Sequence, residues 1–342
     1  MRTKMMLRWL ACALLGSTLL WGASCGQNKT QPDQNASGTS ATNPFRVALL
    51  LTGPVSDDGW NAAAQEGLLA IEREVGAQTA IVESLDKSKF EENFRQFAGQ
   101  GYNLILGHAY EFQDAALQVA PEFPKTTFLI VAGNSSSTNV GSVHFRLEDA
   151  TYVLGALAAK MSKTGRGGLV GGEEIPSLKP GFEGFIAGAK SINPNFEVIT
   201  KYVGNWNDVG TARELAEALI AQGADAIFQK ADTAGLGVFQ AAAAHPGVYA
   251  FGSNKNQNGV VPEVVLGSAV IDVPAAFVRL AKAVKAGEYV PKAETMGTKE
   301  GVVTVLMNRT LVSELPPEIN AFVEDLKKKI ETGEITALPQ SS

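Results

Sequence analysis

From Phe45 almost to its end, the chain alternates short runs of β-branched and apolar residues with longer stretches of helical periodicity. Strands that alternate with helices at this spacing indicate βαβ units and parallel sheets. Several runs are apolar at successive positions, as expected of strands covered by helices on both faces. The predicted strands are 46–51, 80–83, 103–107, 127–131, 168–171, 197–202, 226–229, 249–252 and 264–270. The predicted helices are 60–74, 87–100, 112–120, 150–162, 180–191, 208–222 and 236–244.

A second series of helices and strands begins near Thr151, after the first series has supplied four strands. We therefore expect two similar α/β lobes rather than one very wide sheet. Ligands of such lobes bind at the carboxyl ends of the strands, so two facing lobes would form a site in their cleft. The predicted N-terminal lobe comprises residues 45–147 and about 258–295, and the C-terminal lobe comprises 148–257 and about 296–339.

Residues 1–24 have the pattern of an export signal. Arg2, Lys4 and Arg8 precede an apolar run, 9–20, that is too short for a comfortable transmembrane helix. Small residues then lead to Cys25, at the position where a bacterial lipobox places its acylated cysteine. Gly22 stands where such signals usually carry Leu, and an ordinary cleavage site with an incidental thiol is the alternative. We predict lipidation at Cys25 and a membrane-anchored protein that faces the periplasm or the cell exterior.

A polar segment joins this cysteine to the first strand. Residues 27–44 contain almost no large apolar side chain, so 25–44 is predicted to be a flexible, lipidated tether. The whole chain has 342 residues, of which 45% are hydrophobic and 19% charged, enough for two packed cores. Its net charge is −6, without a basic run, which argues against a nucleic-acid partner. Apart from Cys12 in the signal, Cys25 is the only cysteine, so no disulfide framework or thiolate metal site is expected.

Signatures of catalysis are missing from the sequence. It contains no GxSxG elbow, no HExxH and no P-loop. The run from Gly165 to Gly168 precedes a predicted strand instead of following one, so we interpret it as a turn. His108, His144 and His245 are widely spaced and lack the spacing of a metal site or a triad. We therefore expect no enzyme activity, no cofactor and no metal.

The segment that carries most chemistry follows the first strand, where a loop rich in Gly, Pro and Asp (52–59) leads into a helix. Asp58 is placed either to cap that helix or to accept a hydrogen bond from a ligand. Trp60 would lie at the cleft, where its indole could stack on a planar heterocycle. The alternative is that Asp58 is only a cap and that Trp60 only packs on the sheet.

An ordered series of weaker motifs extends this pattern along the chain. They are DATYVLGALAAKMSKTG at 149–165, GGEEIP at 171–176, GFEGF at 181–185, GNWND at 204–208, QGAD at 222–225 and GSNKNQ at 252–257. The series resembles the basic membrane protein family, the PnrA-like substrate-binding lipoproteins of ABC transporters, over nearly all of the chain from Phe45. The resemblance implies a type I periplasmic-binding-protein fold, with purine nucleosides or related purines as ligands.

The resemblance also implies roles for particular residues. In the family, an aromatic residue and an Asn open the first helix, matching Trp60 and Asn61, and an acidic residue before them matches Asp58. A second aromatic, matching Phe182, holds the base from the other side. Loops after other predicted strands supply further candidate ligand contacts: His108, Tyr110, Trp206 and Asp232, for which packing at the rim of the cleft is an equal alternative.

Four positions depart from the family pattern where members grip ribose. Asn254 and Asn256 stand where both residues are commonly Asp, Ile271 stands where a Lys is frequent, and Thr52 replaces a frequent Asp. Neutral or apolar side chains thus replace charged contacts, and purine bases without a sugar become candidate ligands.

We predict a monomeric extracytoplasmic substrate-binding lipoprotein that delivers a purine base or nucleoside to the permease and ATPase of an ABC importer. Two alternatives use the same fold: a receptor for a sugar or another non-purine molecule, and a sensor that signals to a partner. A NAD-binding Rossmann enzyme is disfavoured by the missing motifs and by the export signal.

Overall fold

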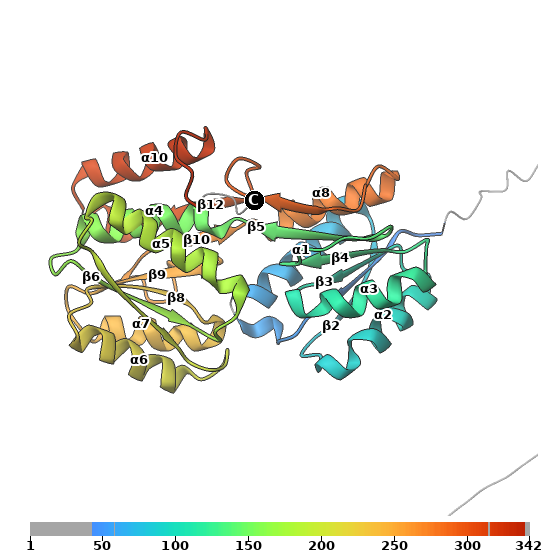
Figure 1. Ribbon diagram of the computed structural model, residues 1–342, viewed down its shortest axis with the longest axis horizontal. Helices are drawn as coiled ribbons and strands as arrows, with labels where there is room; N and C mark the ends of the chain where they lie inside the picture. The colour runs from blue at the N-terminus through green and yellow to red at the C-terminus, as the bar shows by residue number, and fades with distance from the viewer. Residues whose placement is uncertain (1–42, 58, 314, 339–342) are drawn as a thin grey trace, which may run out of the picture. The chain divides into compact units, whose positions relative to one another are not determined.

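The computed structural model describes residues 43–57, 59–313 and 315–338, which form two α/β lobes with a six-stranded sheet each (Figure 1). The N-terminal sheet has the order β11-β5-β4-β3-β1-β2, and all its strands are parallel. The C-terminal sheet has the order β12-β10-β9-β8-β6-β7, with only β12 antiparallel. The predicted pair of parallel lobes is confirmed.

The first sheet consists of β1 (Arg46–Leu50), β2 (Gln78–Val82), β3 (Leu104–Gly107), β4 (Thr127–Val131), β5 (Val140–Phe145) and β11 (Ala293–Met296). The second consists of β6 (Arg166–Gly171), β7 (Glu197–Tyr202), β8 (Ala226–Lys230), β9 (Tyr249–Asn254), β10 (Val265–Ile271) and β12 (Val303–Met307).

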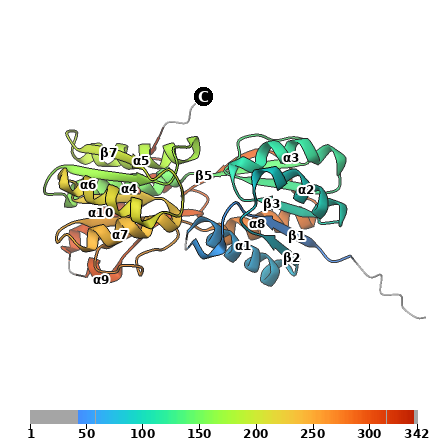
Figure 2. The ribbon, with the colours of Figure 1, turned by 90° about the horizontal axis from the view of Figure 1, so that it is seen from below.

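Helices cover both faces of each sheet. In the N-terminal lobe, α2 and α3 lie on the side opposite α8 (Figure 2). In the C-terminal lobe, α4 and α5 lie on one face and α6 and α7 on the other (Figure 1). None of the helices that the structure describes combines the length and the apolar run that a bilayer crossing requires. The helices are α1 (Trp60–Val75), α2 (Phe90–Gly99), α3 (Gln113–Val119), α4 (Leu147–Met161), α5 (Lys179–Ile192), α6 (Val209–Ala221), α7 (Gly235–Ala243), α8 (Val273–Ala286), α9 (Arg309–Val312) and α10 (Pro317–Glu331).

Strand β1 shows why its run of apolar residues forms a central strand. Successive side chains of a strand point to opposite faces of the sheet. Val47 and Leu49 pack in the cluster that contains Ala63 of α1, whereas Leu50 packs in the cluster that contains Phe94 of α2. Because both faces are covered, every position after the first is buried. The carboxyl end of β1 then delivers residues 52–57 to the cavity described below.

Three segments connect the lobes: β5 to α4, β10 to α8, and β11 to β12. Backbone hydrogen bonds tie them together, from Arg146 N–H to the Met296 carbonyl (2.9 Å) and from Asp272 N–H to the Val302 carbonyl (2.7 Å). The observed crossing differs from the boundary expected near residue 258. Strand β10 pairs with β9 and β12 in the C-terminal sheet, so the chain returns to the N-terminal lobe only at Asp272. The continuous burial of Val265–Ala269 explains this placement, because these side chains fill the core between helices on both faces.

Glycines allow α4 and α5 to pack with their backbones in contact. A Cβ atom on Gly155 would overlap the backbone carbonyl of Phe185, and one on Gly188 would overlap that of Tyr152. A Cβ on Gly184 would lie 2.7 Å from the Glu148 carbonyl oxygen. The GFEGF motif and Gly188 therefore have a structural role, the close approach of α5 to α4, the helix that begins at the connection between the lobes.

Candidate functional site

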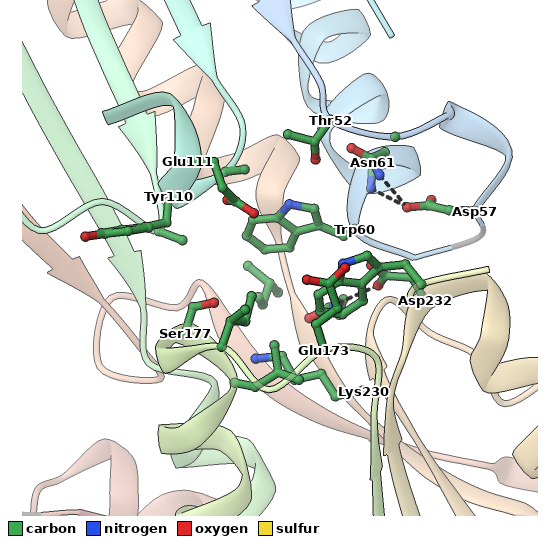
Figure 3. Close-up of a pocket in the computed structure, with 18 of the residues that line it drawn as sticks. Thr52, Asp57, Trp60, Asn61, Tyr110, Glu111, Glu173, Ser177, Lys230 and Asp232 are labelled. Carbon is green, nitrogen blue, oxygen red and sulfur yellow. Dashed lines mark hydrogen bonds between the residues drawn. The ribbon is translucent and has the colours of Figure 1, made fainter. Parts of the chain in front are cut away.

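A cavity of about 480 Å³ lies between the carboxyl ends of the strands of the two lobes (Figure 3). Its volume lies within the usual range for small-molecule sites. The walls combine aromatic and aliphatic side chains with a few charged ones, which is also typical of such sites. The lining residues are Thr52, Gly53, Pro54, Asp57, Trp60, Asn61, Ser84, Ala109, Tyr110, Glu111, Ala132, His144, Phe145, Leu147, Glu173, Ile175, Ser177, Leu178, Trp206, Asn207, Lys230, Asp232, Asn254 and Ile271.

Asp57 organises the start of α1. Its Oδ1 accepts hydrogen bonds from the N–H groups of Gly59 (3.0 Å) and Ala62 (2.9 Å). Its Oδ2 accepts from the backbone N–H (2.8 Å) and the side-chain Nδ2 (2.9 Å) of Asn61. A buried carboxylate thus satisfies helix N–H groups that have no partner within the helix. Asp57 therefore has the capping role considered for Asp58, which itself lies outside the described residues.

The indole of Trp60 is held in place from behind by His108. The two rings stack with centroids 4.0 Å apart and an interplanar angle of 26°. Trp60 Nε1 donates to the His108 carbonyl (3.1 Å), and His108 Nε2 lies 3.0 Å from the Trp60 carbonyl oxygen. Burial lowers the pKa of His108 to about 3, so the ring is neutral and Nε2 carries the proton that this contact needs. His108 is therefore a support beneath Trp60 and lies outside the cavity lining, whereas Trp60 is part of that lining.

Asn61 lies beside Trp60 in the cavity wall (Figure 3). Its Nδ2 is committed to Asp57, while its buried Oδ1 has no hydrogen-bond partner among the described residues. Gly53 makes room for the amide, since a Cβ there would lie 2.6 Å from Nδ2. A buried acceptor without a partner costs about 1–3 kcal/mol. Asn61 Oδ1 is therefore available to a donor that enters the cavity.

Two charged residues enter the cavity from the end of β8. Lys230 is the last residue of that strand, and Asp232 opens the 3₁₀ helix Asp232–Ala234 with a φ of 48°. The Asp232 carboxylate accepts from the backbone N–H of Trp60 in the other lobe and from Asn254 Nδ2 (3.4 Å). Burial, together with the charge of Asp57, raises the pKa of Asp232 to about 7, and burial lowers that of Lys230 to about 8. At pH 7 each group is therefore charged in a smaller fraction of the molecules than it would be in water.

A second group of ionisable residues surrounds the connection from β5 to α4. Arg146 forms ion pairs with Glu148 (3.7 Å) and Asp149 (3.2 Å). Burial raises the pKa of Glu148, whose Oε2 has no hydrogen-bond partner among the described residues. Burial and the charges of Lys230 and Arg146 lower the pKa of His144, which lines the cavity. His144 therefore offers the cavity a neutral imidazole at pH 7.

Six of the residues proposed from the sequence lie in the cavity wall: Trp60, Asn61, Tyr110, Trp206, Asp232 and Asn254. Thr52 and Ile271, the positions of two departures from the family pattern, also lie there.

Other proposed residues lie elsewhere. Phe182 is 4% exposed and packs in the core edge-to-face against Phe228, with centroids 6.0 Å apart, because it occupies the buried face of α5. Asn256 is exposed, and its Oδ1 accepts from the N–H of Asn258 (3.2 Å). His245 lies next to Glu217, away from the cavity. Cys25 lies outside the described residues.

Besides Asp57, sequence reasoning missed three charged residues of the cavity wall, Glu111, Glu173 and Lys230. Each lies at the end of a strand of a parallel sheet or within four residues after it. The rule that ligands bind at the carboxyl ends of such strands would have pointed to all three. They were overlooked because none belongs to a motif that the resemblance had connected with ligand binding.

The fold and the cavity define a two-lobed small-molecule binding protein. The chain belongs to the PnrA-like family of ABC transporter substrate-binding proteins, whose family model (Bmp) matches residues 45–338. The expected family is thereby confirmed, and the role of that family is substrate binding.

Individual relatives agree with this assignment. The chain is 29% identical over 300 residues to a purine-binding protein of Brucella abortus (strain 2308), covering 86% of this chain and 83% of that protein. It is 31% identical over 297 residues, or 84% of each chain, to the transcriptional activator protein med of Bacillus subtilis (strain 168). A solute-binding protein of an ABC transporter system from Aeropyrum pernix K1 shares the fold, with a TM-score of 0.77 at 23% identity, covering 87% of this chain and 94% of that one.

Proposed function

We propose that the protein binds a purine nucleobase or nucleoside in the cavity between its lobes and delivers it to the permease and ATPase of an ABC importer. The observation that carries this proposal is the geometry of Trp60, whose ring lines the cavity while His108 supports it from behind. A supported indole is a good platform for a flat heterocycle. The purine-binding relative from Brucella gives independent support for this ligand class.

The polar groups around Trp60 suit the edge of a purine ring. Asn61 Oδ1 can accept, Asp232 can accept or donate at a pKa near 7, and Lys230 can donate. A nucleobase presents both donors and acceptors around a flat apolar ring. In our proposal Trp60 contacts the face of the base, and Asn61 and Asp232 contact its edge, with Tyr110 and Trp206 closing the cavity.

Replacing Trp60 tests the proposal directly. We expect Trp60→Ala to weaken purine binding by about 1–3 kcal/mol, the usual contribution of stacking between a base and an aromatic ring. Trp60→Phe keeps a ring at this position and is the matched control, with a smaller loss. Isothermal titration calorimetry with purine bases and nucleosides measures both effects. Unchanged affinity in a folded Trp60→Ala variant would show that Trp60 only packs on His108.

A receptor for a sugar on the same fold is the second candidate. The carboxylates of Glu111, Glu173 and Asp232 in the cavity wall favour it, because carboxylates commonly hold pairs of hydroxyl groups. Native mass spectrometry of the purified protein separates the two candidates, because the mass of a retained ligand identifies its class. A pentose or hexose bound without a base would replace the purine proposal.

We also propose that Cys25 is acylated and holds the protein at the outer face of a membrane. The basic and apolar start of the chain and the polar segment 27–44 support this. We expect Cys25→Ala to move the protein from the membrane fraction to the soluble fraction, while Cys12→Ala, a change within the signal, leaves it in place. A Cys25→Ala protein that still sediments with membranes, together with an unacylated wild-type N-terminus, would contradict the proposal.

A further inference from the structure

Lys230 is the only Lys or Arg in the cavity wall among the described residues, and its position distinguishes one edge of the cavity from the others. Its side chain extends into the cavity below Trp60 in the view of Figure 3. None of the described carboxylates forms an ion pair with it. An ammonium group that no carboxylate contacts directly, although the charges of Asp232 and Glu148 act on it, retains donors for which a ligand can supply the acceptor.

The neighbouring acceptor is Asp232, two residues along the same loop. Its carboxylate contacts the Trp60 N–H and Asn254 Nδ2, and its charge influences the pKa of Lys230. Lys230 and Asp232 thus both line the cavity, one with a cationic donor and the other with an acceptor, close enough for their charges to interact. A base stacked on Trp60 would direct one edge toward this pair.

From this arrangement, and on the basis of the proposed function, we infer that Lys230 and Asp232 select 6-oxopurines over 6-aminopurines. A 6-oxopurine carries an acceptor, O6, beside a donor, N1–H, which complements an ammonium group beside a carboxylate. Adenine carries the opposite pattern, an amino group at C6 and an acceptor at N1. In the same orientation, adenine would place its amino donor opposite the Lys230 donor and its N1 acceptor opposite the Asp232 acceptor. Polar groups left unpaired in a binding site discriminate strongly between such analogues.

Hypoxanthine and adenine test the inference because they differ at this edge. In calorimetric titrations at pH 7.5, we expect the wild-type protein to bind hypoxanthine at least about tenfold more tightly than adenine. A tenfold ratio corresponds to the binding free energy that is lost when one polar group in a site has no partner. Inosine and adenosine repeat the comparison in case the sugar is needed for binding.

Two substitutions then assign the preference to its residues. Lys230→Met keeps the length of the side chain and should weaken hypoxanthine binding about tenfold while changing adenine binding less than threefold. Asp232→Asn turns an acceptor into a group that can also donate to N1 of adenine, so it should shift the preference toward adenine. Lys190→Met, on the exposed end of α5, is the matched control and should change neither affinity.

The outcomes separate the inference from the proposed function. Equal binding of both purines by the wild type, or an equal loss of both in Lys230→Met, overturns the selection by Lys230 and leaves the purine receptor intact. The absence of binding for all four compounds overturns both. The wild-type comparison needs no variant, so a Lys230→Met protein that failed to fold would not leave the inference untested.

Discussion

At the scale of single residues, the cavity wall is defined by side chains whose hydrogen bonds are already determined by the protein. Asp57 uses both oxygens at the start of α1, and His108 uses its ring and its carbonyl to hold Trp60. This leaves Asn61 Oδ1, Lys230 and part of the Asp232 carboxyl group for a ligand. Trp60 was predicted as a wall residue from its place after the loop that follows the first strand, and Asn61 was predicted from the resemblance to the family. Asp58 was considered for the cap of this helix, whereas the structure gives that role to Asp57.

The raised pKa of Asp232 leads to a prediction about how the stability of the protein depends on pH. The pKa of this residue is raised to about 7 in the folded protein, mainly by burial, whereas in an unfolded chain the pKa of an Asp has its ordinary value of 3.8. Between these values the folded protein binds a proton that the unfolded chain does not, so the residue's contribution to stability falls as the pH rises. Asp232→Asn removes this effect. We therefore expect the difference in melting temperature, variant minus wild type, to be larger at pH 7.5 than at pH 5. Each 1 kcal/mol of change in the free energy of unfolding corresponds to about 2–4 °C.

Thermal unfolding of the ligand-free proteins at the two pH values provides the measurement. The exposed Asp114 of α3 supplies the control, since Asp114→Asn should shift the melting temperature by the same amount at both. A difference for Asp232→Asn that shrinks or stays constant as the pH rises would contradict the raised pKa.

At the scale of elements, buried and continuous apolar runs were the easiest to predict. Strand β4, a buried apolar run, spans the residues that the sequence pattern indicated. Strand β7 also has the predicted bounds, although it is only partly buried. Strand β5 was missed because Gly141, Ser142 and His144 interrupt its apolar pattern. Strand β11 was missed because Glu294 and Thr295 make it look like a loop, although pairing with β5 fixes it at the sheet edge. Tertiary pairing, which local sequence does not encode, decides such short edge strands.

The α4–α5 contact gives a prediction at this scale. Gly188→Ala would bring a methyl group into the Tyr152 backbone, and we expect it to lower the free energy of unfolding by about 1–3 kcal/mol. Gly99→Ala at the end of α2, where a Cβ meets no atom within 4 Å, is the matched control and should not destabilise the protein. Urea unfolding followed by circular dichroism measures both. Equal midpoints for wild type and Gly188→Ala would mean that the two helices can separate without cost.

At the scale of the whole molecule, the order of motifs identified the two-lobed fold, but the path of the chain between the lobes required the structure. Three connections meet at Arg146, Asp272 and Met296, and their pairing depends on β10 lying in the C-terminal sheet. A run such as 264–270 can be recognised as a strand from its residues, but nothing local indicates which of two similar sheets it joins. The same limit applied to Phe182, because a phenylalanine on an amphipathic helix can face either a core or a cleft.

The composition of the whole cavity wall bears on whether the ribose of a nucleoside adds to binding. Thr52, Asn254 and Ile271 lie in this wall. The resemblance to the family leads us to expect charged residues at these three positions, so we infer that neutral side chains replace charged contacts to ribose. Charge-assisted hydrogen bonds contribute about 1.5–3 kcal/mol each, and an apolar side chain opposite a hydroxyl leaves that hydroxyl without a partner. Asn254 is further committed, because its Nδ2 already faces Asp232. We therefore expect free purine bases to bind at least as tightly as their nucleosides.

Calorimetric titration of adenine, guanine and hypoxanthine against adenosine, guanosine and inosine measures this difference. Ile271→Lys adds a donor at the sugar side and should shift the preference toward nucleosides, whereas Ile271→Met keeps the wall apolar and should leave the preference unchanged. The carboxylates of Glu111 and Glu173 also line the cavity and could hold a ribose diol in place of the missing charges. A consistent preference of about tenfold for the nucleosides, equal to about 1.4 kcal/mol, would show that they do.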